Sequence, residues 1–164
     1  MSILQICMSI EGSALGTFVR ESLYGFQALV AIHILGLTLS VGTLLWWDLR
    51  LLGVGLRNVR VSELYRRLMP WTLTGFLVMF ITGLLLFTGF ATKAYGNIPF
   101  RIKITAQVLA AANALVYHSV TERRIARWDE AARPPLGARI AGLTSIVLWA
   151  VVIMCGRLIS YTMF

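Results

Sequence analysis

The chain has 164 residues, of which 58% are hydrophobic and only 13% are charged, and its mean hydropathy is +0.78. These values exclude an ordinary soluble domain and indicate a polytopic membrane protein. The length suits one unit, so we expect a single transmembrane domain over residues 1–164. The net charge of +8 does not predict a nucleic-acid partner, because the basic residues gather in the loops between apolar segments.

Residues 1–13 precede the first long apolar segment. They contain no basic n-region and no clear cleavage site after their short apolar stretch, so we do not expect a removed signal peptide. We predict instead a short helix that lies on the outer membrane surface.

Four apolar segments follow, at about residues 23–47, 69–92, 102–121 and 140–162. Each is close to the roughly 20 residues that a helix needs to cross about 30 Å of hydrocarbon. The expected fold is therefore an all-α integral membrane four-helix bundle. Pro70 is expected to open the second helix, and Asn97 with Pro99 is expected to form the cap and first turn of the third.

Arginines are concentrated in two of the three loops. The loop after the first span and the loop after the third each carry five of them: Arg50, Arg57, Arg60, Arg66 and Arg67, then Arg123, Arg124, Arg127, Arg133 and Arg139. The positive-inside bias puts both loops in the cytoplasm, so both termini face the outer, periplasmic side. The expected location is a bacterial inner membrane, crossed several times, with lipid as the surrounding partner.

Both histidines of the chain, His33 and His118, lie inside uncharged apolar segments. A titratable ring in hydrocarbon is costly and usually has a partner or a function, so we look for chemistry at these two positions first. On the helical face of His33, Gly36 and Ser40 leave a shallow groove. On the face of His118, the small residues Ala111 and Ala114 flank the ring, together with Leu115. Small residues of this kind also permit close helix packing with no cofactor involved, and this alternative stays open.

Two transmembrane histidines on different helices fit axial ligation of one haem b iron by neutral imidazoles. Alternatively, each ring is satisfied separately by hydrogen bonds. Zinc or copper is less well supported, although Met79 and Cys155 offer soft ligands; otherwise Cys155 and Cys7 are expected to be inert packing. At 1.5 Å per residue, His33 lies about 15 Å below the outer edge and His118 about 24 Å, which counts against a shared iron.

Polar residues near the helix ends complete the prediction. Arg101 and Lys103 either snorkel to outer headgroups or clamp the propionates of a haem. Asn113 is expected to hydrogen-bond between helices. Asp48, with Arg50, is expected to pair across the bundle with the basic residues that follow the third span, Arg123 or Arg124. Arg157, beside Tyr161, has the same two alternatives as Arg101 and Lys103, and snorkelling is the preferred one.

Two stretches resemble known membrane families: HILGLTLSVGTLLWWDLRLLG, residues 33–53, and FRIKITAQVLAAANALVYH, residues 100–118. They are similar to an uncharacterised group of bacterial four-helix membrane proteins and, more distantly, to the flavin-free protoporphyrinogen oxidase and copper-resistance membrane families. The matching positions are His33, Gly42, Arg50, Lys103, Tyr117 and His118. For the oxidase family the resemblance implies a b-type haem held by His33, with Lys103 also functionally important.

The expected function is that of a membrane b-type haem protein that carries electrons within the bilayer, linked to quinone or acting as a subunit of a larger membrane redox complex. A cofactor-free structural or assembly subunit is the alternative from a different class. A porphyrin-oxidising enzyme is the third, so the sequence leaves open whether the protein is an enzyme.

Overall fold

The computed structural model describes residues 2–121, 125, 128–131 and 133–163, and this part of the chain is helical, without a β-strand. Three short helices accompany four long ones. The short helices are α1 (Ile3–Glu11), α2 (Ala14–Glu21) and α5 (Ala91–Gly96); the long helices are α3 (Gly25–Leu52), α4 (Val61–Gly89), α6 (Ile98–Val116), which continues as a π-helical turn (Tyr117–Thr121), and α7 (Leu136–Thr162).

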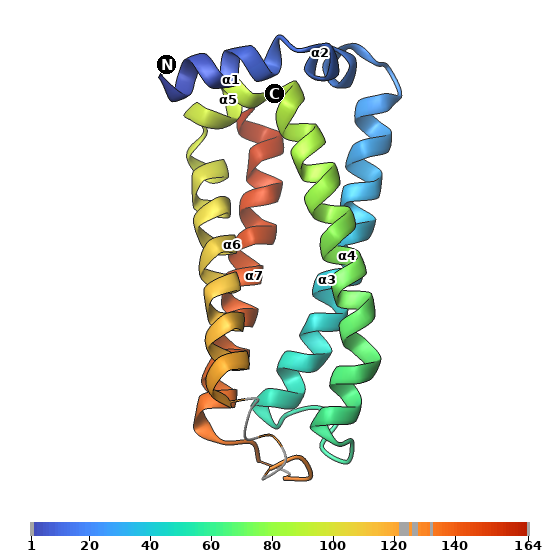
Figure 1. The fold of residues 1–164 in the computed structure, drawn as a ribbon, viewed down its shortest axis with the longest axis vertical. Helices are drawn as coiled ribbons and strands as arrows, with labels where there is room; N and C mark the ends of the chain where they lie inside the picture. Colours follow the sequence, from blue (N-terminus) through green and yellow to red (C-terminus); the bar gives the residue numbers. More distant parts are fainter. Residues whose placement is uncertain (1, 122–124, 126–127, 132, 164) are drawn as a thin grey trace.

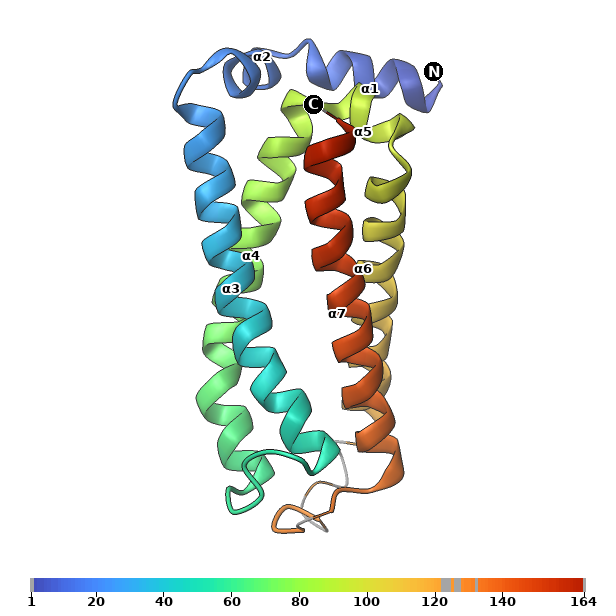
Figure 2. The ribbon, with the colours of Figure 1, turned by 180° about the vertical axis from the view of Figure 1, so that it is seen from behind.

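The four long helices run side by side, and α1 and α2 lie across one end of them, where both chain termini are also found (Figures 1 and 2). Helix α3 packs on α4, α6 packs on α7, and α3 also contacts α7. Helices α3, α4 and α7 are long and apolar enough to cross a membrane. Helix α6 coincides with the third predicted span, but Arg101, Lys103, Gln107 and Asn113 make it more polar than the other three.

The second long helix begins earlier than its hydropathy indicates. Helix α4 starts at Val61, so Pro70 lies inside it and does not open it as predicted. Asp129 explains the extra turns, because its carboxylate accepts hydrogen bonds from the Ser62 N–H and hydroxyl, both at 2.7 Å, and so caps the helix. The cap of α6 is as predicted, with Asn97 Oδ1 accepting from the Phe100 N–H at 2.9 Å.

Helices α3 and α4 cross in close contact through small residues. A Cβ added to Gly75 would lie 2.5 Å from the Ser40 nitrogen and 2.8 Å from the Gly36 oxygen, so no side chain fits there. Above and below this point, His33 faces Thr82 at 3.0 Å and the Thr43 and Thr72 hydroxyls lie 2.7 Å apart. The predicted cofactor groove at Gly36 and Ser40 is therefore filled by the α4 backbone, and these residues serve helix packing.

At the end of the molecule away from the termini, Arg50 is completely buried. Its guanidinium donates to the backbone oxygens of Val59, at 2.9 Å, and Ala131, at 3.3 Å, and so connects the two loops at this end. Nearby, Asp48 is buried and lies close to the Ser145 side chain of α7. The predicted partners of these two residues, Arg123 and Arg124, lie outside the described residues. Asn113 bonds between helices as predicted, donating to the Ala141 oxygen at 2.9 Å.

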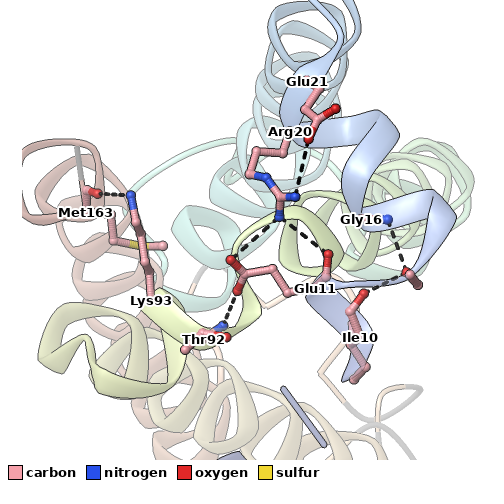
Figure 3. Close-up of polar contacts among 9 residues, drawn as sticks. Ile10, Glu11, Gly16, Arg20, Glu21, Thr92, Lys93 and Met163 are labelled. Carbon is pink, nitrogen blue, oxygen red and sulfur yellow. Dashed lines mark hydrogen bonds and ion pairs between the residues drawn. The ribbon is translucent and has the colours of Figure 1, made fainter. Parts of the chain in front are cut away.

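At the terminal end, Glu11 holds α1 and α2 to the rest of the molecule (Figure 3). Its carboxylate accepts from the Thr92 N–H at 2.8 Å, at the start of α5, and lies 3.7 Å from the Arg20 guanidinium. Burial alone would raise the pKa of Glu11, but the Thr92 hydrogen bonds and the charges of Arg20 and Lys93 hold it below its ordinary value. The sequence predicted one short helix here and missed α2.

The Gly75→Ala variant is expected to lower the free energy of unfolding by about 1–3 kcal/mol, because the added methyl group overpacks the α3–α4 crossing. Gly42→Ala is the matched control, since nothing lies within 4 Å of a Cβ at Gly42; it is expected to be neutral or slightly stabilising. Thermal unfolding in detergent, followed by circular dichroism, measures both variants. Equal midpoints for the two would contradict the close crossing.

The Glu11→Ala variant is expected to speed amide hydrogen exchange at the start of α5 by roughly fivefold, the equivalent of one net hydrogen bond. Because the folded-state pKa of Glu11 is lowered, the wild-type contact is fully present above about pH 4.3, the ordinary glutamate pKa, and is lost as pH falls through the lowered value. The variant and the wild type should therefore converge in acid. Glu21→Ala is the control, because Glu21 lies 3.6 Å from the same Arg20 but outside this contact. Equal exchange in both variants would rule out the Glu11–Thr92 hydrogen bond.

Candidate functional site

A cavity of about 360 Å³ lies among α3, α4, α6 and α7 in the half of the molecule nearer the termini. Most of its lining is apolar, and it includes the rings of Phe26, Phe87, Phe90 and Phe100. The polar side chains of the lining are His33, Lys103, Arg157 and Ser160. The volume is within the usual range for small-molecule sites, about 300–1,000 Å³.

His33 reaches the cavity from α3 and is held by α4. Its Nδ1 lies 3.0 Å from the Thr82 Oγ1, and the Thr82 hydroxyl itself donates to the Val78 oxygen at 2.6 Å. Since the Thr82 proton is used in that bond, we assign the proton of the imidazole to Nδ1, which leaves the lone pair on Nε2. Gly83 makes room for the ring, because a Cβ there would lie 3.2 Å from the His33 Cε1.

Two cations share the cavity with His33. The Lys103 Nζ, on α6, would lie 3.9 Å from a Cβ at Gly156, so the amine points toward α7. Arg157, on α7, stacks its guanidinium on the Tyr161 ring at 5.2 Å. The ion pairs among the described residues are formed by Arg20, Arg60 and Arg67, and none of them involves either cation.

Aromatic contacts close the sides of the cavity. Phe87 of α4 and Phe100 of α6 are stacked, with centroids 5.8 Å apart and an angle of 15° between the rings. Phe26 of α3 meets Phe90 edge-on at 5.3 Å. The α4–α6 side of the cavity is therefore a wall of rings, against which a flat apolar ligand can pack.

His118 lies at the opposite end of the molecule. Its ring packs edge-on against Tyr65, with centroids 5.9 Å apart, whereas His33 contacts Thr82. These two contacts on α4 are seventeen residues apart, or about 25 Å along the helix. One iron cannot reach both rings, so the predicted pair of axial ligands is not brought together. The depths below the outer membrane edge that the sequence predicts for His33 and His118 place them closer together than they are.

The other predicted site residues also lie away from the cavity, with one exception. Ala111 and Ala114 are exposed on the outside of α6. Arg101 is exposed and lines a separate groove on the outer face of α6 and α7. Lys103, two residues along, is the exception, because it is turned inward. A difference of two residues on a helix is about 200°, so the two cations face opposite ways.

Sequence reasoning missed several residues of the cavity. Met79 was considered only as a copper ligand, and Gly83, Phe87, Phe90 and Phe100 were not singled out at all. Arg157 was noted, but with snorkelling preferred over a contact with propionates. The feature of the sequence that could have indicated a site residue was the position of Arg157 on the last outer turn of the final span. His33, Met79 and Lys103 are the lining residues whose side chains can ligate a metal, while the described residues contain no group of three or more His, Cys, Asp or Glu for a zinc-type site.

Three apolar helices of spanning length and a cavity of ligand size define the class: a helical membrane protein with a candidate small-molecule site in one half. A family model described as "Family of unknown function (DUF6644)" matches residues 10–162, and the chain belongs to this family. No curated protein and no solved structure matches the chain significantly.

Proposed function

We propose that the protein is a multi-pass bacterial inner-membrane protein that holds one b-type haem in the cavity, with His33 as an iron ligand. It carries electrons within the bilayer, with quinone or other membrane subunits as its partners. The observation that carries the proposal is His33 itself: a histidine in an apolar cavity, with Nδ1 tied to Thr82.

The hydrogen bond to Thr82 supports iron ligation. A metal-ligating histidine usually donates its other ring N–H to a fixed acceptor, which sets the tautomer and orients the ring. Thr82 provides that acceptor. His33 therefore has the preorganisation that a ligand to iron needs, with Nε2 as the ligating nitrogen.

The surroundings fit a haem as well. The Phe87–Phe100 wall offers a flat apolar surface, and the half-buried Lys103 offers a positive charge. When bound, haem supplies one-electron transfer through its iron, at a potential that the axial ligand and the polarity of the pocket adjust. The residues of this chain bind the macrocycle, orient it and exclude water from it.

The proposed orientation has all four long helices crossing the bilayer, with the cavity in the outer half. Support comes from the position of both termini at one end and of Arg57, Arg60, Arg66 and Arg67 at the other. The exposed apolar side chains of α1 and α2 suit the outer interface: Ile3, Leu4, Ile6, Met8, Leu15 and Phe18.

The visible spectrum tests the cofactor. Purified protein, expressed with ample haem supply, is expected to show b-type bands in the reduced-minus-oxidised spectrum. His33→Ala should lose the bands or convert them to a different coordination state. His118→Ala is the matched control and should keep them, because its contact on α4, Tyr65, lies about 25 Å along that helix from Thr82, the contact of His33.

Two outcomes would contradict this assignment. A colourless wild-type protein would favour the cofactor-free assembly subunit, in which the Thr82 hydrogen bond simply satisfies His33. Loss of the bands in His118→Ala alone would indicate that the haem site lies at the other end of the molecule. A porphyrin-oxidising activity is tested separately, by supplying protoporphyrinogen and an electron acceptor and following porphyrin fluorescence.

The orientation is tested by cysteine labelling in a Cys7→Ala/Cys155→Ala background. A membrane-impermeant maleimide added to intact spheroplasts is expected to label Tyr95→Cys, whereas Arg57→Cys should react only after permeabilisation. Both positions are exposed in the fold, so their accessibility differs only through the membrane. Labelling of Arg57→Cys in intact spheroplasts would show that the topology is the opposite of the proposed one.

A further inference from the structure

The cavity has a mouth, and it lies between α3 and α7. The lining residues that are exposed are Ile34 of α3 and Ile153, Arg157 and Ser160 of α7. The lining residues of α4, α5 and α6 are buried or half-buried, and the stacked Phe87 and Phe100 close that side. The α3 and α7 ribbons diverge toward the terminal end (Figure 2). In the proposed orientation this mouth opens sideways into the bilayer.

A pair of cations without carboxylate partners spans the site from mouth to interior. Arg157 stands at the mouth and Lys103 inside, and none of the described residues that line the cavity is Asp or Glu. An ammonium that is half-buried in an apolar cavity is costly unless it is paired. The site is therefore electrostatically incomplete, and an anionic group on the ligand would complete it.

The cations also lie at one level. Lys103 is five residues from the start of α6 and Arg157 five residues from the end of α7, so each is about 7.5 Å from the terminal end of its helix. His33 is eight residues into α3, or about 12 Å. The positive charges are thus about one helical turn nearer the outer end than the proposed iron ligand.

We propose that Arg157 and Lys103 bind the carboxylates of the ligand, which enters from the lipid through the α3–α7 mouth with its acidic edge toward the outer end. The inference rests on the proposed function, in which the ligand is a haem with two propionates. The stacking on Tyr161 orients the Arg157 guanidinium. Arg101, the sequence-predicted alternative, faces the opposite side of α6 and has no part in this site.

Haem and its dimethyl ester separate this inference from the haem assignment, because the ester keeps the ring and the iron but has no carboxylates. Apo-protein in detergent is titrated with each, and the Soret band gives the dissociation constants. Wild type is expected to bind haem at least about tenfold more tightly than the ester, since charge-assisted hydrogen bonds are lost with the ester. Arg157→Gln should reduce this preference severalfold, and Lys103→Met should also reduce it.

Arg101→Gln is the matched control, because Arg101 lies at the terminal end of the molecule like Arg157 but outside the cavity. This variant should keep the wild-type preference for haem over the ester. Arg157→Lys should keep part of it. Equal affinity of the wild type for haem and ester would overturn the inference and leave the haem assignment standing. Binding of neither compound would overturn both. An equal loss in Arg101→Gln and Arg157→Gln would also overturn it, and if Arg157→Gln does not fold, the wild-type comparison still decides.

Discussion

The close crossing of α3 and α4 is the contact on which the rest of the structure depends. Gly75 has no space for a side chain against Gly36 and Ser40, so the two backbones can meet at one register only. The Thr43–Thr72 hydrogen bond holds the same register further along. This register of the two helices also places His33 opposite Thr82. A helix that slid or rotated by one residue would turn this contact by about 100° and separate the pair.

The two ends of the molecule are built differently, and this difference leaves room for the cavity. At the arginine-rich end, the buried Arg50 connects the loops and Asp48 reaches Ser145 of α7, so α3 and α7 are held together. At the terminal end, α3 and α7 diverge, and Glu11 holds α1 to the start of α5. Apolar lining and phenylalanine rings surround the space between them. The cavity therefore lies at the end where α3 and α7 are apart.

The cavity contains few polar groups, so the proposed chemistry depends on these few side chains. His33 is the histidine of the lining, and its hydrogen bond to Thr82 leaves a defined nitrogen for ligation. Lys103 and Arg157 add positive charge one turn nearer the outer end, where the acidic edge of a ligand would lie. His118, surrounded by Tyr65 and Tyr117, belongs to the aromatic packing of the opposite end.

The sequence alone determined the all-helical class, the length and apolar character of three spanning helices and local features such as the Asn97 cap, because these depend on residues close together in the chain. The haem and the quinone-linked function stay predictions. Only the tertiary structure decided which residues share a site: it separated His118 from His33, turned Arg101 out and Lys103 in, placed Arg157 beside the same cavity, and used Gly36 and Ser40 for packing. The physical reason is that the facing and depth of a side chain follow from the rotation, tilt and register of whole helices. Contacts between distant segments set these, as at Gly75, and spacing along one helix does not contain them.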